Sequence, residues 1–137
     1  MIGACIEVHR HLGPGLLESA YDHCLAHELA QRGLRVRRQV PIPVNYKGLS
    51  LRCGYRIDLL VDERLIVEVK AVERILPVHG AQVITYLKLT GLVVGLLVNF
   101  QVPFLREGIR RLLLPSPNPS VPPFLFVHSR PPNREAG

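Results

Sequence analysis

The sequence predicts an α/β domain in which a mixed β-sheet lies between helices. Apolar side chains recur at helical spacing in residues 16–32 and 79–90, whereas short runs rich in Val, Ile and Leu occupy residues 55–71 and 92–100. Helical and strand patterns that alternate in this way are typical of a sheet covered by helices. The chain has 137 residues, 47% of them hydrophobic, which suits one domain with a substantial core.

Two helices begin the predicted order. The first covers residues 2–12 and ends at a Gly-Pro-Gly triplet, residues 13–15, because proline restricts the residue before it and glycine tolerates left-handed backbone. The second covers residues 16–32, which carry a wide apolar stripe, and Gly33 follows its end.

A strand at the edge of the sheet follows. Residues 34–44 alternate apolar and polar side chains but contain Pro41 and Pro43. Proline cannot donate a hydrogen bond to a ladder, so we expect an edge strand or a broken one. Residues 45–48 then predict a turn, and residues 49–54 lead into a central hairpin.

The second half of the chain alternates helix and strand. After an irregular connection, residues 79–90 predict a helix that Gly91 ends. Residues 92–100 carry no charge and predict a strand buried on both faces. Residues 104–114 set leucine and isoleucine against three arginines, which predicts a last amphipathic helix. The expected order is thus helix, helix, edge strand, hairpin, helix, strand and helix, an α/β sandwich around a mixed sheet.

The composition changes at Pro115 to one rich in Pro, Ser and Asn, which favours a flexible tail without a fixed fold. We therefore divide the chain into a folded domain at residues 1–114 and a Pro-rich tail at residues 115–137. Within the tail, residues 124–127 form an apolar segment that could dock on the domain.

The central hairpin, residues 55–71, carries charge where its strands are otherwise apolar. Asp58 interrupts the first run, and Glu68 and Lys70 interrupt the second. Glu68 and Lys70 are two residues apart and so project on the same face. An unpaired charge among apolar neighbours costs several kcal/mol. These positions therefore indicate a cross-strand salt bridge, a polar face turned to water, or a metal ion.

The length of the hairpin turn decides whether Asp58 and Glu68 meet. A two-residue turn pairs Asp58 with Val69 and leaves the carboxylates on opposite faces, whereas a three-residue turn at residues 62–64 places Asp58 directly across from Glu68. In that register two like charges repel unless a cation lies between them. Oxygen ligands of this kind suit Mg²⁺ or Mn²⁺.

Two motifs resemble those of a known superfamily. Asp58, followed after nine residues by Glu68-Val69-Lys70, resembles the core motif of the PD-(D/E)xK nucleases. Near the N-terminus, Gly15-Leu-Leu-Glu18-Ser-Ala-Tyr21 matches G-x-x-E-x-x-Y, the signature that names a family of small bacterial and archaeal proteins in that superfamily. The combination is far more specific than either motif alone.

A third feature points to one branch. Gln82 and Tyr86 are four apart on a predicted helix and share a face, which resembles the additional motif of RecB-like and lambda-exonuclease-like nucleases. The resemblance covers residues 2–113. It implies a restriction-endonuclease-like sandwich with a central mixed sheet flanked by helices, and a metal-dependent nuclease that acts on phosphodiesters, most plausibly in DNA.

The resemblance also implies roles for single residues. Asp58, Glu68 and the carbonyl of Val69 would hold Mg²⁺ or Mn²⁺, and Glu18 would bind it directly or through water. Lys70 would orient or deprotonate the attacking water, or stabilise the developing charge. The catalytic set is then Asp58, Glu68 and Lys70. Three further side chains would orient the site or bind substrate: Tyr21, Gln82 and Tyr86.

Charge supports a polyanionic partner. The net charge is +6, and a cluster of arginines could neutralise phosphates or could form a solvated strand edge. The cluster consists of Arg32, Arg35, Arg37 and Arg38.

Cysteine usage and hydropathy predict a cytoplasmic protein without a membrane partner. The three cysteines are scattered, the N-terminus lacks a secretory pattern, and no apolar run reaches the 18 or more residues of a membrane helix. Two other hypotheses remain beside the nuclease. One is a noncatalytic module that binds nucleic acid or a partner and retains the fold; the other is a structural domain whose charges pair with each other and which has no metal affinity.

Overall fold

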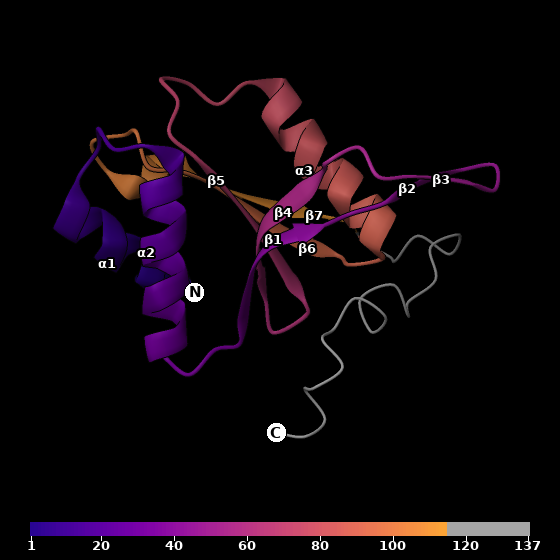
Figure 1. Ribbon diagram of the computed structural model, residues 1–137. Helices are drawn as coiled ribbons and strands as arrows, with labels where there is room; N and C mark the ends of the chain where they lie inside the picture. The colour runs from indigo at the N-terminus through magenta and orange to yellow at the C-terminus, as the bar shows by residue number, and fades with distance from the viewer. Residues whose placement is uncertain (115–137) are drawn as a thin grey trace.

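The computed structural model describes residues 1–114, which form a five-stranded sheet with helices on both faces (Figure 1). The tail expected at residues 115–137, with its apolar segment 124–127, lies outside the described residues. In chain order the elements are α1 (Ile2–Leu12), α2 (Glu18–Gln31), β1 (Val36–Pro41), β2 (Val44–Tyr46), β3 (Leu49–Leu51), β4 (Arg56–Val61), β5 (Leu65–Lys70), α3 (Pro77–Thr90), β6 (Val94–Asn99), the 3₁₀ turn η1 (Leu105–Gly108) and β7 (Ile109–Leu113).

The sheet is mixed, and its strand order is β1-β4-β5-β6-β7. β5 and β6 are parallel, whereas the neighbouring pairs on either side are antiparallel. Parallel neighbours need a crossover connection, which α3 supplies. The predicted fold class, an α/β sandwich with a central mixed sheet flanked by helices, is confirmed.

Helices α1 and α2 cover one face of the sheet and α3 covers the other (Figure 1). Each face has its own core, because successive strand residues point to opposite faces. Leu25 of α2 belongs to one core with Val67, and Leu87 of α3 belongs to the other with Ile66; each of the four is 0% exposed. The sheet is therefore buried on both sides along its centre.

Proline sets the edge of the sheet, as predicted. β1 is an outer strand that ends at Pro41, and the N–H of Ile42 donates to the carbonyl of Tyr55 at 2.8 Å. The chain then forms a separate hairpin of β2 and β3, whose turn residues Lys47 and Gly48 have φ of 48° and 87°. Positive φ at both positions is the backbone of a two-residue type I′ turn. The hairpin extends away from the body of the domain (Figure 1).

The helix predicted at residues 104–114 is wrong. η1 and β7 occupy this segment, and β7 pairs antiparallel with β6. The open edge of β6 offers a ladder of backbone partners, and that gain outweighs the weak intrinsic preference of a short segment for a helix. Gly108 favours this path as well, because a Cβ there would collide with the carbonyl oxygen of Asn99.

The predicted helix ends are close to those observed. α2 begins at Glu18 and α3 at Pro77, and Gly91 ends α3 in the left-handed region with φ of 78°. Proline fits the start of α3 because the first helical N–H has no partner within the helix. Over residues 1–114, no helix combines the length and the apolar character needed to cross a membrane.

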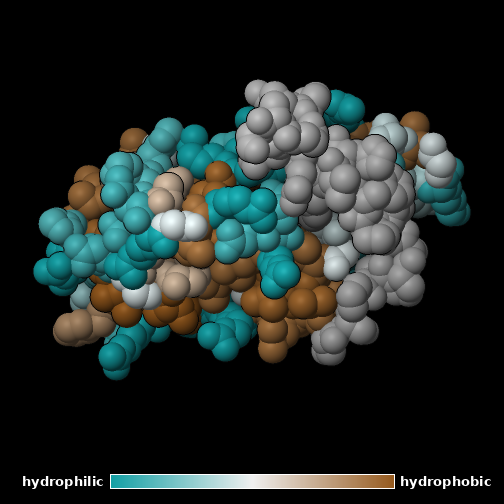
Figure 2. All heavy atoms as spheres, turned by 90° about the horizontal axis from the view of Figure 1, so that it is seen from below, coloured by the Kyte–Doolittle hydropathy of each residue, from teal (hydrophilic) through white to brown (hydrophobic). Residues whose placement is uncertain are grey.

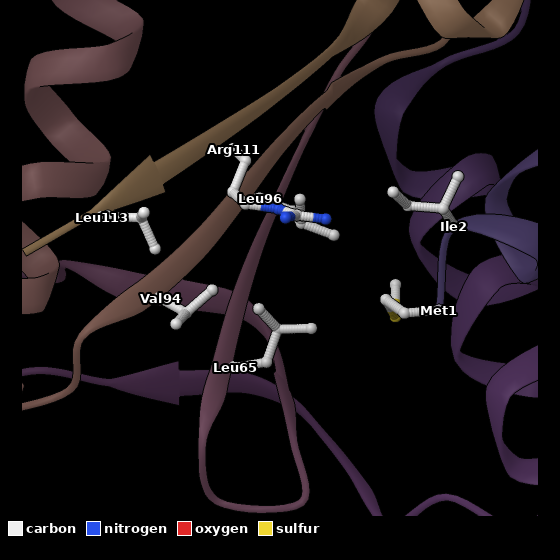
Figure 3. A pocket seen from close by; sticks show the side chains of 7 residues that line it. All are labelled: Met1, Ile2, Leu65, Val94, Leu96, Arg111 and Leu113. Carbon is white, nitrogen blue, oxygen red and sulfur yellow. The ribbon is translucent and has the colours of Figure 1, made fainter.

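An apolar hollow of about 460 Å³ opens at the amino ends of β5 and β6 (Figure 3). Met1 and Ile2 lie across it from Leu65 and Val94, and Arg111 of β7 also lines it. Seen from below, the molecule shows hydrophobic residues along the lower middle of its surface, with hydrophilic ones around them (Figure 2). The charged residues of the central hairpin lie at the opposite ends of these strands.

Candidate active site

The turn between β4 and β5 is the three-residue alternative. Val61 pairs with Leu65, and two further pairs follow in the same register. Asp62, the first turn residue, has φ of 52°, so the turn uses left-handed backbone. The next position of the register after those pairs places Asp58 opposite Glu68.

At that position side-chain contacts replace the regular ladder. The N–H of Asp58 donates to Glu68 Oε2 at 2.9 Å, and the N–H of Val69 donates to Asp58 Oδ2 at 2.8 Å. Each carboxylate thus accepts the hydrogen bond that a carbonyl of the opposite strand accepts in a ladder. The two carboxylates therefore lie between β4 and β5, where the backbone ladder stops. We call this interruption of the ladder the gap.

This gap lies at the carboxyl ends of the parallel strands β5 and β6, the end at which ligands bind in open α/β sheets. Asn99, the last residue of β6, fixes the chain beyond β5: it accepts the N–H of Val72 at 3.0 Å and donates to the carbonyl of Val72 at 2.8 Å. The side chain of Gln101 accepts the N–H of Gly15 at 2.9 Å. The segments on both sides of the gap are thereby held in place.

Burial controls the charge of the two carboxylates. Glu68 is 3% exposed, and this burial, followed by the negative charge of Asp58, raises its pKa to about 8. Burial also raises the pKa of Asp58, although the N–H of Val69 opposes the shift. Like charges this close favour a retained proton unless a cation replaces it. The pair therefore favours binding of positive charge.

The donor atoms fit a small hard cation. Asp58 and Glu68 supply carboxylate oxygens, and the carbonyl of Val69 points to the same neighbouring strand as its N–H, which donates to Asp58. Within residues 1–114, no group of three or more His, Cys, Asp and Glu side chains could hold a metal ion on its own. Mg²⁺ typically takes one or two protein carboxylates and completes its shell with water and substrate phosphate, so this limited set suits it.

Glu18 begins α2 and lies beside the same gap. Its Oε2 accepts the N–H of Ala71 at 3.3 Å, immediately after the end of β5. Its negative charge contributes to the raised pKa of Glu68. A hollow of about 370 Å³ is lined by Glu18 and Asp58 together. Glu18 and Asp58 therefore face the same hollow, and Glu18 lies close enough to Glu68 to raise its pKa.

Tyr21 fixes the loop that leads to Glu18. Its ring is 0% exposed and stacks on Phe100, with centroids 4.5 Å apart and an interplanar angle of 7°. The Tyr21 hydroxyl donates to the carbonyl of Gly13 and accepts the N–H of Leu16 at 3.2 Å. These two hydrogen bonds tie Tyr21 to the segment from Gly13 to Leu16, which leads into the first turn of α2, where Glu18 lies.

A hydrogen-bonded chain runs from Lys70 into α3. Lys70 Nζ donates to Gln82 Oε1 at 3.3 Å, and Gln82 Nε2 donates to the hydroxyl of Tyr86 at 3.1 Å. Burial, followed by the charge of Glu68, raises the pKa of Tyr86. The positive charge of Lys70 acts against the rise in the pKa of Glu68 and makes that rise smaller. The structure therefore brings these four side chains to one place from β5 and α3.

Sequence reasoning missed one further acidic residue near Asp58, namely Asp22. Asp22 is 4% exposed, and Arg38 donates to both of its oxygens, at 3.0 and 3.1 Å. Gln39 Nε2 donates to Asp22 Oδ2 at 2.8 Å and to Asp58 Oδ1 at 3.4 Å. Gln39 adopts φ of 53°, a backbone region that such residues rarely occupy. The available sequence signal was the position of Asp22 four residues after Glu18 on one helix.

The predicted phosphate-binding cluster of arginines is already paired within the protein. Arg32 contacts Glu28 at 2.9 Å and Arg37 contacts Glu63 at 3.0 Å. Arg38 binds Asp22, and Arg35 lies 4.0 Å from Asp62. Each arginine thus has an acidic partner from α2 or from the β4–β5 turn. The phosphate-binding interpretation and the solvated-edge interpretation both stay predictions.

The fold and these side chains first define a class. A mixed sheet between helices, with a carboxylate and a lysine at the carboxyl end of β5 and a second carboxylate beside them on β4, is the arrangement of restriction-endonuclease-like domains. A family model of the PD-(D/E)XK nuclease superfamily matches residues 1–112. The chain belongs to this superfamily, whose members generally use divalent metal ions and act on nucleic acid. Comparison with curated proteins gives no match, and neither does comparison with solved structures.

Proposed function

We propose that this protein is a Mg²⁺- or Mn²⁺-dependent nuclease that hydrolyses phosphodiester bonds in DNA. The observation that carries the proposal is the meeting of Asp58, Glu68 and Lys70 at the gap between β4 and β5. The approach of Glu18 to the same gap and the contact between Lys70 and Gln82 support membership of the G-x-x-E-x-x-Y family in the RecB-like branch.

Asp58, Glu68 and the Val69 carbonyl would hold the cation, and Glu18 would reach it directly or through water. When bound, such an ion polarises a phosphoryl oxygen and lowers the pKa of a coordinated water. The carboxylates must be ionised to bind it, so binding displaces the proton that burial favours on Glu68.

Lys70 would supply a positively charged side chain to the proposed site, in addition to the metal ion. Its Nζ can donate to a phosphate oxygen as negative charge develops there, or hold the attacking water. Gln82 accepts one Nζ hydrogen and is itself held by Tyr86, which limits the directions that the ammonium can take. Gln82 and Tyr86 are therefore positioning residues for Lys70, as Tyr21 is for Glu18.

The test is cleavage of single- and double-stranded DNA and RNA with Mg²⁺ or Mn²⁺, alongside calorimetric metal titration. We expect Lys70→Ala to lose cleavage by at least about 100-fold, the size of a lost charge-stabilising donor, while it keeps metal binding. Asp58→Asn should lose both, because it removes an oxygen ligand. Lys88→Ala, which removes an exposed lysine of α3, is the matched control and should keep both.

Two outcomes would overturn the proposal. Wild-type protein that binds metal and cleaves none of these substrates would favour the noncatalytic binding module. Wild-type protein that binds no divalent metal would favour a structural domain in which the charged side chains only pair with each other.

A further inference from the structure

A groove of about 650 Å³ leads away from Lys70 along α3. One wall is α3, with Gln82, Thr85 and Tyr86, and the opposite wall includes Val44 of β2 and Tyr55, which precedes β4. The volume lies in the range of pockets that hold small organic ligands. The groove is thus continuous with the proposed site but extends beyond its carboxylates.

Two hydrogen-bond donors line the groove. Lys70 is there, and His79 lines the groove one helical turn before Gln82. His79 Nδ1 accepts the N–H of Leu76 at 2.9 Å, so the proton of the neutral imidazole is on Nε2 and remains available as a donor. A cationic ammonium and an N–H donor in one groove suit a phosphate group.

The groove also offers an aromatic surface. Tyr55 is 48% exposed, although its backbone is fixed by the hydrogen bond from Ile42. Val78, 64% exposed on α3, borders the same groove. An exposed tyrosine in a groove that is also lined by apolar side chains and a cation is a surface on which single nucleobases stack.

We propose that this groove holds one unpaired nucleotide of the substrate, with its base stacked on Tyr55 and its phosphate at Lys70. This inference rests on the proposed nuclease function and specifies its substrate class. Bases within a duplex are stacked on each other and cannot reach such a surface without unpairing. The preferred substrate is therefore single-stranded DNA or a frayed or flapped end, and intact duplex binds more weakly.

The experiment uses the absence of tryptophan from the chain. Tyr55→Trp keeps an aromatic surface in the groove and gives a single indole fluorophore, which a stacked base quenches. Tyr46→Trp is the matched control, because Tyr46 is 60% exposed on the adjoining hairpin and does not line the groove. Each protein is titrated in EDTA with oligothymidylate, with an abasic oligonucleotide of the same length and charge, and with a blunt duplex.

We expect oligothymidylate to quench the indole fluorescence of the Tyr55→Trp variant, and the abasic strand and the duplex to quench it little. The Tyr46→Trp variant should respond weakly to each. In anisotropy titrations with labelled oligothymidylate, Tyr55→Ala should weaken binding about tenfold relative to wild type, the effect of losing one stacked base. Tyr46→Ala should change it less than twofold. Thr85→Trp, which fills the groove from an exposed position of α3, should weaken it like Tyr55→Ala.

The proposal is overturned if no oligonucleotide concentration quenches the Tyr55→Trp variant, or if the abasic strand binds as tightly as oligothymidylate. Equal losses in Tyr55→Ala and Tyr46→Ala would overturn it as well. Because these titrations contain no divalent metal, their result is independent of turnover. Base-dependent binding without cleavage would support the groove and contradict the nuclease, and cleavage without base-dependent binding would contradict the groove alone.

Discussion

The two ends of the β4–β5 hairpin differ although they share the same strands. At the turn end, backbone pairs run in regular register and the side chains are apolar. At the other end, carboxylates accept the N–H groups of the opposite strand, and their burial raises both pKa values. One end therefore stabilises the domain, whereas the other holds carboxylates whose ionised form burial disfavours and which the proposed cation would stabilise.

The comparison separates the apolar residues that stabilise the fold from the charged residues of the proposed site. A hairpin that continued its ladder to the end would be more stable but would leave no space for the cation that we propose. Gln39 shows the same relation on the neighbouring strand, because its backbone takes φ of 53° while its side chain contacts Asp58. Substitutions at the two ends should therefore act on stability in opposite directions.

The largest expected effect on stability is at the regular end. Ile66→Ala removes a fully buried side chain of β5 and should lower the free energy of unfolding by about 3 kcal/mol through lost burial and a cavity. Urea denaturation of the variant and wild type at pH 7 in EDTA measures this change. A cost below about 1 kcal/mol, comparable with an exposed position, would contradict the division between the two ends.

The next effect is at the carboxylate end and has the opposite sign. The pKa of Glu68 is about 8 in the folded protein against 4.5 as the ordinary value. Between these pH values the folded state binds a proton that the unfolded state has lost, so stability falls as pH rises from about 4.5 to about 8. Glu68→Gln removes this loss and should be more stable than wild type at pH 8 by on the order of 2 kcal/mol.

Urea denaturation in EDTA at pH 5 and pH 8 measures the effect of Glu68→Gln, and cleavage assays should show that the same variant is inactive. Adding Mg²⁺ should restore stability to the wild type at pH 8 but not to the variant, because binding needs the ionised carboxylate. The same decline with pH in both proteins would show that Glu68 is not the titrating group.

The smallest effect concerns the orientation of Asp58. Gln39→Ala removes the donor between Asp22 and Asp58, and we expect metal affinity to fall about tenfold with little change in stability. Calorimetric titration with Mn²⁺ measures affinity without reference to cleavage. Gln31→Ala, at the exposed end of α2, is the control and should bind as wild type does. Unchanged affinity in Gln39→Ala would limit Gln39 to a structural role.

The parts of the site that sequence could predict follow from local rules. The period of two in a strand and the turn length bring Asp58 opposite Glu68, and the missing N–H of Pro41 and Pro43 predicts an edge strand. These rules need neighbours along the chain and no knowledge of the rest of the fold.

The missed parts depend on contacts between distant segments. Asp22 and Gln39 lie 17 residues apart in the chain and meet because α2 packs beside β1. The segment at residues 104–114 satisfies a helical pattern, and the open edge of β6 decides its structure instead. The arginine cluster had the charge for phosphate binding, but only the packing of β1 shows which acidic side chains pair with it.

The parts of the candidate site lie far apart in the sequence, so they are synthesised at different times. The hydrogen bond from Ala71 to Glu18 spans 53 positions, and the one from Val72 to Asn99 spans 27. Synthesis at about 5–20 residues per second makes the carboxylates and Lys70 a few seconds before β6, on which β5 must pair. A chain that ends before β6 is expected to lack metal affinity, which calorimetric titration of a fragment of residues 1–90 with Mn²⁺ can test against residues 1–114.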